Sequence, residues 1–429
     1  LLGGPIEVSV VDSSDGKRRV EANLKDARLT VPGFGWTKGA GVPAKATFDL
    51  VEQDKTVEVN DLKVTSDGLD VTGQVRIEDG QLVSAVFDRF ALRPTDKATL
   101  KVERSGRGGY DVVVRGSSLD GRGLLSSFKN QGDEGGTGGS GLGGPLNLRL
   151  DLDTVQGNGG VALTNLKGSL AMSGDQLTAL DLTGSSNGGR SNDLAAKLTP
   201  TGGGNRSLSV DAADTGRILR FLGLYQRLAG GRGSLNATMR RGQPTSGEVT
   251  IHQFEITDDP QVASLIDRTV SSGGRGASDP RPLAFQQPRT ARATAAFEEL
   301  TVPFTEDKGR IQITDAVLRG AAIGGTAGGV LDLKGDRMQI SGTVIPAYAI
   351  NNLFGRVPLL GEILGGGKDG GLFGVTFRLD GPMKSPTFSF NPVSAVTPGI
   401  FRRLFEAEDA DGAPAYPQPA PRDARNNRY

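Results

Sequence analysis

The sequence predicts a mainly β fold made largely of antiparallel strands, and three observations lead to this class. Apolar and polar residues alternate at period two in many short segments, which gives each strand one dry face and one wet face. Glycine accounts for 64 of 429 residues and aromatic residues for only 5%, a composition that favours short strands and tight turns over helical bundles. Asp-Gly, Gly-Asp and Asn-Gly pairs separate the segments and supply the positive φ that hairpins require.

Four strands show this alternation most clearly, at residues 69–78, 146–153, 338–345 and 373–380. One side of each strand carries apolar residues or glycine, and the other side carries mainly polar residues. A loose unit of glycine, strand, turn and strand indicates a degenerate repeat; it recurs at residues 73–87, 168–182 and 329–344. The apolar positions of the four strands are candidate inner-face residues: Leu69, Val71, Val75, Ile77, Leu146, Leu148, Leu150, Leu152, Ile340, Val344, Phe373, Val375, Phe377 and Leu379.

Few segments have a helical pattern. The best candidate is a helix at about 215–229, where Thr215 is a suitable N-cap, one side carries an apolar stripe, and Gly230 and Gly231 follow. Other short helices are expected at residues 259–270, 347–354 and 358–364 and after Pro398. Residues 131–145 form a glycine-rich linker, residues 271–288 a loop, and residues 408–429 a disordered tail, because their composition cannot build a packed core.

This shortage of helices limits how the apolar strand faces can be buried. A sheet must pack its dry face against another layer, and too few helices are present to supply one. The dry faces therefore either contact one another, as in a sandwich or barrel, or line a groove that holds an apolar ligand. The strand pattern alone leaves both arrangements open.

Composition and motifs argue against several classes of function. Lys plus Arg and Asp plus Glu both number 49, whereas nucleic-acid binding requires a net basic surface. The chain has no Cys and a single His, His252, which we expect to lie in an ordinary strand. No metal site, cofactor or thiol chemistry is expected from this residue set.

Two glycine-containing patterns resemble catalytic or cofactor motifs without their context. Residues 184–188, GSSNG, fit the nucleophile-elbow pattern, but the motif needs a His partner and a following helix, whereas Asn187-Gly188 indicates a hairpin turn. Gly136, Gly138 and Gly141 fit a dinucleotide-binding pattern inside the linker, with no helix after it. We therefore expect no enzyme activity; a hydrolase would depend on Ser186.

The segment Ser341 to Phe405 contains the most specific sequence pattern in the chain. Three pieces occur in order: IPAYAINNLFGRVPLLGEILGG, GLFGVTFRLDGPMKSPTFSFNP and TPGIFRRLF. Together they resemble the C-terminal region of the AsmA-like envelope proteins, the YhdP-type group, which is related to TamB and the bridge-like lipid transfer proteins. Looser similarity extends back to about Leu119, through SSLDGRGLL and GRILRFLGLYQRLAGGRGSL.

The resemblance implies an elongated, curved, largely antiparallel sheet that forms an apolar groove, with a few short helices near the C-terminus. It implies a non-enzymatic conduit that moves phospholipid between the inner and outer membranes of a Gram-negative envelope, in the periplasm. The alternative function is a periplasmic scaffold or outer-membrane protein assembly factor without lipid cargo. Within this scheme we assign residues 1–118 to β-groove repeats, 119–257 to an AsmA-like β region, and 258–407 to the C-terminal region.

Membrane attachment is expected to involve two parts of the protein. The sequence begins at Leu1 and has no apolar run of about 18 residues, so we expect an inner-membrane anchor or signal outside this sequence; a protein without an anchor is the alternative. The C-terminal helices either cap the end of the sheet or contact the outer membrane or an envelope partner. The candidate contact residues are Leu353, Phe354, Leu359, Leu360, Arg402 and Arg403.

Overall fold

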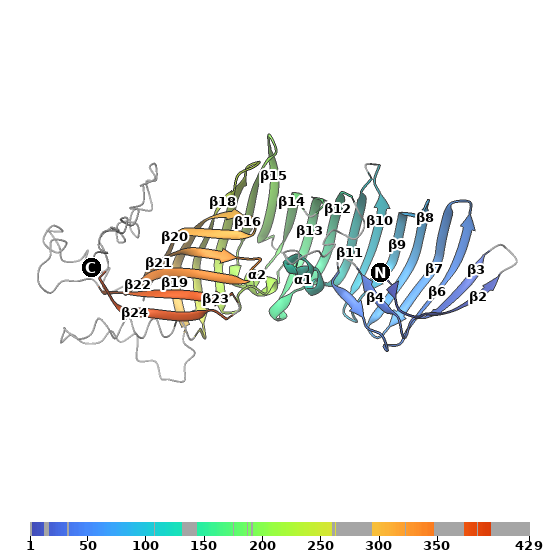
Figure 1. Cartoon of the computed structure of the whole chain (residues 1–429), viewed down its shortest axis with the longest axis horizontal. Coiled ribbons are helices and arrows are strands. Elements are labelled where there is room, and N and C mark those ends of the chain that lie inside the picture. Colours follow the sequence, from blue (N-terminus) through green and yellow to red (C-terminus); the bar gives the residue numbers. More distant parts are fainter. Residues whose placement is uncertain are drawn as a thin grey trace, which may run out of the picture.

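The chain forms one long, curved sheet in the computed structural model (Figure 1). The structure describes residues 2–395 apart from 13–16, 32–33, 107, 131–143, 175, 187, 190–191, 260–261, 263–293, 322, 347–372 and 384. The prediction of a mainly β, largely antiparallel and elongated fold is confirmed. The expected helices at 347–354 and 358–364 and after Pro398 lie outside the described residues, as do the loop at 271–288 and the tail at 408–429. Of the expected helix at 259–270, only Asp259 and Val262 are described.

The main sheet contains the strands β2, β3 and β6 to β24 in chain order. Its first strands are β2 (Glu7–Asp12), β3 (Arg18–Asn23), β6 (Ala44–Gln53), β7 (Thr56–Ser66), β8 (Leu69–Glu78), β9 (Gln81–Ala91), β10 (Lys97–Arg104) and β11 (Tyr110–Asp120). The central strands are β12 (Leu146–Gln156), β13 (Ala162–Ser173), β14 (Gln176–Ser185), β15 (Leu194–Gly202), β16 (Asn205–Ala212), β17 (Leu228–Met239) and β18 (Thr245–Thr257). The last strands are β19 (Thr294–Asp307), β20 (Arg310–Gly320), β21 (Ile323–Asp332), β22 (Arg337–Pro346), β23 (Phe373–Pro382) and β24 (Thr387–Ala395).

Neighbouring strands are antiparallel with one exception among the described pairs. β11 and β12 run parallel, with Val112 opposite Leu148. A parallel pair cannot be joined by a tight turn and needs a crossover; here helix α1 (Arg122–Asn130) and the segment after it make the connection. The predicted linker at 131–145 thus lies within this crossover, and its residues 131–143 are outside the described part.

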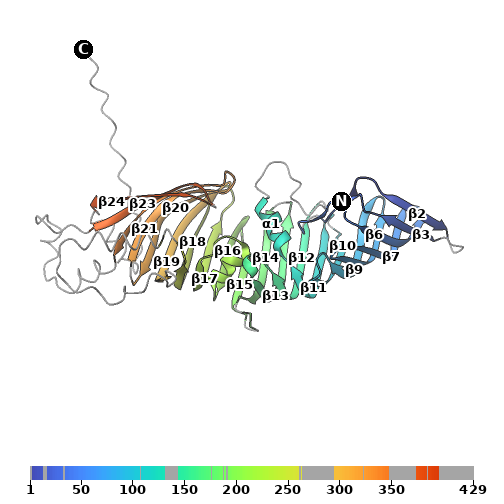
Figure 2. The same ribbon diagram turned by 90° about the horizontal axis from the view of Figure 1, so that it is seen from below.

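The sheet is open and twisted. β2 pairs only with β3, and β24 pairs only with β23, so the described sheet has two free edges. The strands run almost vertically in the cyan and green part of Figure 1 and almost horizontally in the orange part, which shows the twist that sheets accumulate over many strands. Figure 2 shows the same continuous curved sheet from below. No second large sheet packs on it among the described residues, so the sandwich alternative is excluded for this part.

Short N-terminal strands and two helices cover part of the apolar face. β1 (Leu2–Gly3), β4 (Arg28–Val31) and β5 (Trp36–Lys38) form a small separate sheet. From it, Phe34 contacts Phe90 of β9 with ring centroids 4.9 Å apart. The small sheet is held by Lys38, whose buried ammonium donates to the carbonyl oxygens of Ala27 at 2.6 Å and Lys25 at 3.0 Å. The strand ends along one long side of the main sheet lie under these elements; we call this side, marked by Leu69, Leu119 and Leu152, the covered rim. The strand ends along the other long side form the open rim.

Helix α2 (Thr215–Leu222) is shorter than the sequence predicts. The predicted extent of 215–229 is wrong, because Gly223 adopts a left-handed conformation that ends the helix, and Leu228 already belongs to β17. The N-cap is Asp214, whose side chain accepts from the backbone N–H of Arg217, and not Thr215. Leu228 fits the apolar stripe of the predicted helix because it is buried, but it is buried in strand β17 and not in a helix.

The three predicted repeat units share a close approach between strands. A Cβ on Gly73 would lie 2.0 Å from the carbonyl oxygen of Val86, and a Cβ on Gly168 would lie 1.9 Å from that of Asp181. Gly329 is in the same position relative to Gln339, at 2.0 Å. Glycine within a strand marks a tight bend or a close backbone contact. The repeat therefore places a glycine in the middle of the apolar face, where the sheet curves.

Candidate functional site

An uninterrupted row of apolar residues crosses the main sheet from β6 to β24. Each residue lies directly opposite the next one on the neighbouring strand, and the row has one member on each of these 19 strands. We call this set the apolar row: Leu50, Val59, Val75, Ala85, Val102, Val112, Leu148, Leu170, Leu180, Leu198, Leu208, Ala237, Gly247, Phe304, Ile313, Gly329, Ile340, Leu379 and Phe388. With strands about 4.8 Å apart, it extends for roughly 85 Å.

The members of the apolar row are shielded unequally from solvent. Every one is buried or half-buried. Leu198 is 3% exposed, whereas Leu148, Leu170 and Leu180 are only half-buried. No second layer covers the open rim in the described part, so the shielding there comes from neighbouring side chains and from the curvature of the sheet. The thirteen half-buried members therefore present apolar surface that another apolar molecule can cover. The other six are buried and link these surfaces: Ala85, Val102, Val112, Leu198, Ala237 and Ile340.

The opposite face of the sheet is polar and carries ion pairs between neighbouring strands. Lys167 lies 3.1 Å from Asp151, and Arg319 lies 2.8 Å from Glu299. Arg149 and Ser169, which flank Leu148 and Leu170 along their strands, are exposed. Each such pair contributes little to stability because water screens the charges. Their presence on this face shows that it is the solvent-exposed face of the sheet.

The predicted inner-face residues fall into neighbouring rows. Val75, Leu148, Ile340 and Leu379 belong to the apolar row itself. Leu150 lies opposite Gly168 in a middle row, and Val71 and Leu152 lie nearer the covered rim, where they are 9% and 1% exposed. The other predicted positions are all on described strands: Leu69, Ile77, Leu146, Val344, Phe373, Val375 and Phe377.

The predicted residues differ in how much of them is open to a ligand. Leu69 and Leu152 are packed beneath the covering elements in the main apolar core, so they act as core residues in this structure. Val75 and Leu148 are half-buried and nearer the open rim. Phe377 stacks on Phe388 with ring centroids 6.0 Å apart. Phe373 and Val375 lie on the described backbone of β23, and their side chains are outside the described part, as are all six candidate membrane or partner contact residues.

Most of the apolar row was missed at the sequence level. Leu170, Leu180 and Leu208, for example, lie in strands whose alternation is present but weaker. A count of apolar residues at period two in β13, β14 and β16 would have found them. The order in which they line up could not be read from the sequence, because cross-strand register depends on hairpin length and on bulges.

A buried acidic pair joins the sheet to helix α1 at the crossover. The Asp96 carboxylate accepts from the backbone N–H groups of Asp120 at 2.8 Å, Arg93 at 2.9 Å and Leu92 at 3.1 Å. Burial raises the pKa of Asp96 despite these hydrogen bonds. The Asp120 carboxylate accepts from Nε of Arg122 at 2.9 Å and lies 3.1 Å from Nε of Arg93. Both carboxylates have hydrogen-bond or ion-pair partners within the protein, so the pair stabilises the junction between the sheet and helix α1.

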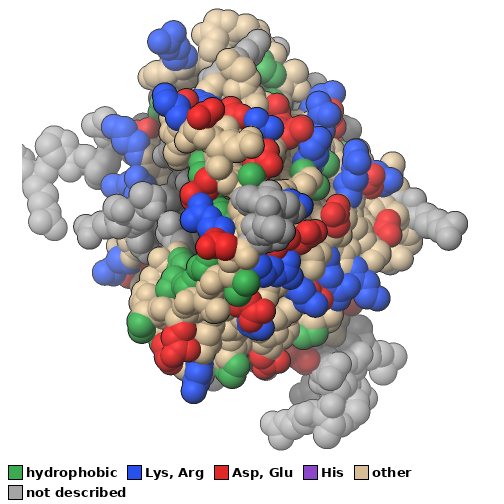
Figure 3. All heavy atoms as spheres, turned by 90° about the vertical axis from the view of Figure 1, so that its right-hand side faces the viewer, with side chains coloured by type: hydrophobic (Ala, Val, Ile, Leu, Met, Phe, Trp, Pro, Cys, Tyr) green, Lys and Arg blue, Asp and Glu red, His purple; other side chains and the backbone are tan. Residues whose placement is uncertain are grey.

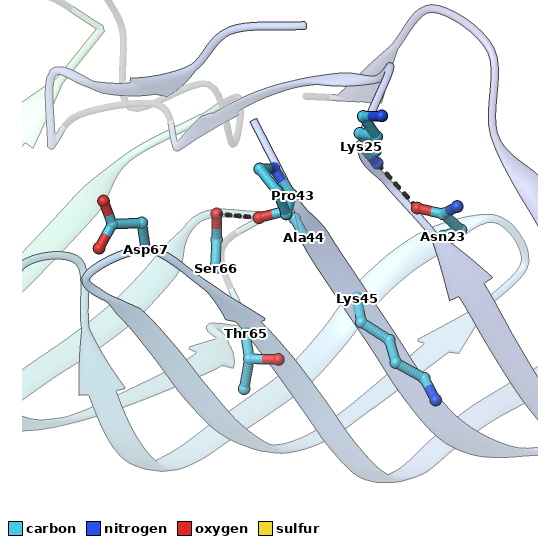
Figure 4. A pocket seen from close by; sticks show the side chains of 8 residues that line it. All are labelled: Asn23, Lys25, Pro43, Ala44, Lys45, Thr65, Ser66 and Asp67. Carbon is cyan, nitrogen blue, oxygen red and sulfur yellow. Dashed lines mark hydrogen bonds between the residues drawn. The ribbon is translucent and has the colours of Figure 1, made fainter. Parts of the chain in front are cut away.

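A shallow polar pocket lies at the covered rim, apart from the apolar row (Figure 4). Ser66 Oγ donates to the carbonyl oxygen of Pro43 at 2.7 Å, and the N–H of Lys25 donates to Asn23 Oδ1 at 3.1 Å. Its lining residues are Asn23, Lys25, Pro43, Ala44, Lys45, Thr65, Ser66 and Asp67. The pocket therefore lies between the ends of β3, β6 and β7, close to the small N-terminal sheet.

The first three residues of the nucleophile-elbow pattern, Gly184 to Ser186, are buried at the end of β14, whereas Gly188 is exposed. Ser186 is fully buried, and its Oγ donates to the carboxylate of Asp193 at 3.0 Å. Its backbone N–H donates to the same oxygen at 2.5 Å. His252 is exposed on β18, opposite Arg232 and Glu299. The prediction that His252 lies in a strand is confirmed, and Ser186 has a carboxylate where a serine nucleophile would need an imidazole base.

The described residues contain neither a metal-ligand cluster nor a membrane-spanning helix. No cluster of three or more His, Cys, Asp or Glu side chains with metal-binding geometry occurs among them. None of the described helices has the length and apolar character needed to span a bilayer.

The fold and the row define a class of structure: an open, single-layer β-sheet with one continuous apolar face. No protein-family model, curated protein or solved structure matches this chain.

Proposed function

We propose that this protein is a non-enzymatic lipid-transfer conduit that holds acyl chains along the apolar row. The observation that carries the proposal is the row itself: 19 consecutive strands present an apolar residue or glycine at the same level of one face. A core that served stability alone would require only that each strand be buried somewhere. A row in register along the whole sheet is what a sliding apolar ligand requires.

The size of the hydrophobic effect explains why a continuous row matters. Each methylene removed from water contributes about 0.8 kcal/mol. A phospholipid with two chains of ~16 carbons would lose on the order of 25 kcal/mol if both chains entered water between binding sites. An unbroken apolar surface avoids this cost at every step, while the head group stays in solvent at the open rim. Similar residues along the row also give similar affinity at each step, so no position becomes a trap.

The cellular setting of the proposal rests on the AsmA-like pattern of residues 341–405. It supports phospholipid as the ligand, the periplasm as the location, and the inner and outer membranes as donor and acceptor. In this proposal an anchor outside this sequence attaches the protein to the inner membrane. The C-terminal segment then approaches the outer membrane or an envelope partner.

Site-specific photo-crosslinking tests the proposal directly. The chain has no Cys, so Leu148→Cys and Arg149→Cys each give a single attachment point for a photoreactive maleimide. These neighbours on β12 point to opposite faces. After purification from Gram-negative membranes and irradiation, mass spectrometry should find phospholipid adducts on the Leu148→Cys protein with about tenfold higher yield.

Two outcomes would contradict the proposal. Equal adduct yields at both positions would mean that lipid binds without regard to the apolar face. If neither position captured lipid while native mass spectrometry found bound proteins, the alternative of an envelope scaffold without lipid cargo would be favoured.

A further inference from the structure

Exposed large hydrophobic side chains concentrate at the N-terminal end of the sheet. Of the eight such residues in the described part of the chain, five lie between Leu2 and Val11. Three of them belong to β2: Val8 is 50% exposed, Val10 is 53% exposed and Val11 is 63% exposed. Figure 3 looks onto this end of the molecule, where hydrophobic side chains reach the surface between charged ones.

The backbone of β2 is also unpaired on one side. In the described structure β2 pairs with β3 alone, so its outer edge offers a series of N–H and C=O groups to solvent. Natural edge strands are commonly protected by lysine, proline or a bulge. β24, at the other edge of the sheet, contains Pro392 and pairs with β23 through a register shift. β2, with the sequence EVSVVD, has no lysine, proline or register shift, and its charged residues, Glu7 and Asp12, lie at its two ends.

Val8 and Val10 also continue the apolar face to the edge. Val10 lies opposite Val20, which lies opposite Phe48 on β6. Val8 lies opposite Ala22, which lies opposite Ala46. The apolar face therefore extends onto β2, the outermost strand at this end of the described sheet.

We propose that the free edge of β2 is a docking site for one further β-strand from outside residues 1–429. The existing partner, β3, shows which residues suit β2. Arg18 lies opposite Asp12, Val20 opposite Val10, and Asn23 donates to the Glu7 carboxylate at 2.9 Å. The incoming strand has apolar residues facing Val8 and Val10 and a basic residue near Asp12, and it adds to the sheet through backbone hydrogen bonds.

A peptide patterned on β3 tests this docking site. The probe is RRVEAN, the sequence of residues 18–23, with two threonines added at each end. The control probe, RRVAEN with the same ends, has the same composition but places Val and Ala on opposite faces. Fluorescence anisotropy should show binding of the first probe that is at least about tenfold tighter than binding of the control. Hydrogen exchange should slow at the amides of Glu7–Asp12 when the probe is bound.

A variant of the edge strand completes the test. Val8→Lys with Val10→Lys introduces the residues that protect natural edges, at positions that are already half in solvent. Far-UV circular dichroism should be unchanged, and probe binding should be lost. Equal binding of both probes, equal binding to the variant, or no change in exchange at β2 would overturn the proposal. Dimerisation of the unmodified protein that the lysines abolish would also overturn it, because the occupant would then be a second copy of this chain.

Discussion

Gly73 shows how single residues shape the curved sheet. It lies in the middle of β8 on the apolar face, and a Cβ there would meet the carbonyl oxygen of Val86 at 2.0 Å and the Cα of Phe87 at 2.8 Å. These are backbone atoms of the neighbouring strand, which cannot move aside as the end of a flexible side chain could. The residue is therefore fixed by contact distance, because its φ is not in the left-handed region.

The first prediction follows from this contact. Gly73→Ala should destabilise the protein by about 1–3 kcal/mol, because the added methyl group forces β8 and β9 apart. Thermal unfolding followed by circular dichroism measures the effect. Gly39→Ala is the matched control, since a Cβ at Gly39 meets nothing within 4 Å, and it should change stability by less than about 0.5 kcal/mol. Equal losses of stability in the two variants would show that the close contact between Gly73 and Val86 does not determine the stability of the sheet.

Among single residues, the sequence predicts the turn positions well. Gly68, Gly80 and Gly174 all have positive φ, and so do the non-glycine residues Asp79 and Asp336. These positions were recognisable because Gly and Asp tolerate the left-handed region for local reasons. The sequence predicts apolar residues or glycine on one side of the strand 69–78, and Gly73 lies on that side. Its contact with Val86 depends on the neighbouring strand, which local sequence does not specify.

At the scale of elements, helix α1 and the small N-terminal sheet were missed and helix α2 was overextended. α1 follows a strand directly and has only nine residues, RGLLSSFKN, with no strong cap signal. α2 was overextended because the apolar spacing continues past Gly223 into β17. Such helices gain their stability from packing on the sheet and not from intrinsic propensity, and this is why sequence pattern alone misjudged them.

The second prediction concerns the junction between β11 and α1. Asp120 has a side chain that is only 2% exposed and is paired with Arg93 and Arg122. Burial acts to raise the pKa of Asp120, but the hydrogen bonds and charges of Arg122 and Arg93 outweigh it and hold the pKa below the ordinary value of 3.8. Asp120→Asn removes this charge and should cost about 1–3 kcal/mol of stability at neutral pH.

The pH dependence of this loss has a definite sign. Because the folded-state pKa of Asp120 is lowered, its contribution to stability is fully present above pH 3.8 and is lost as the pH falls through the folded-state value. The difference in melting temperature between wild type and Asp120→Asn should therefore be constant near neutral pH and shrink below pH 4. Asp153→Asn, on the exposed face of β12, should show little difference at any pH. A difference in melting temperature between wild type and Asp120→Asn that did not decrease below pH 4 would contradict the lowered pKa of Asp120.

At the scale of the whole molecule, the sequence predicts the type of sheet but not its order. Alternation and turn pairs identify strands and hairpins, and hairpins place consecutive strands side by side. The parallel pair of β11 and β12 could not be foreseen, because a glycine-rich linker permits either direction of return. The apolar row is likewise a property of the assembled sheet: bulges such as those at Gly73 and between Thr301 and Phe304 reset the register strand by strand, and yet the apolar residues remain aligned.

A conduit differs from a set of separate binding sites in how it responds to damage at single positions. Lipid that travels along the apolar row must pass every strand, so one charged residue anywhere in the row should block transfer. We therefore predict that Val59→Lys, Leu170→Lys and Ile313→Lys, on β7, β13 and β20, each reduce transfer by about tenfold or more, because a charge beside acyl chains is costly. The assay is the movement of fluorescent phospholipid between two vesicle populations, each tethered to one end of the sheet.

The controls and the amount of bound lipid separate the conduit from its alternatives. Ser169→Lys and Gln312→Lys lie beside two of these positions on the exposed face, and transfer should be unchanged in both. The bound phospholipid per protein should fall only slightly in each row variant, since a charge disturbs one of 19 strands of the row and leaves the others intact. A sharp loss of transfer with nearly full lipid occupancy is the signature of a blocked path. If only one of the three row variants lost transfer, the lipid would occupy a local site, and the remainder of the apolar row would serve the stability of the sheet.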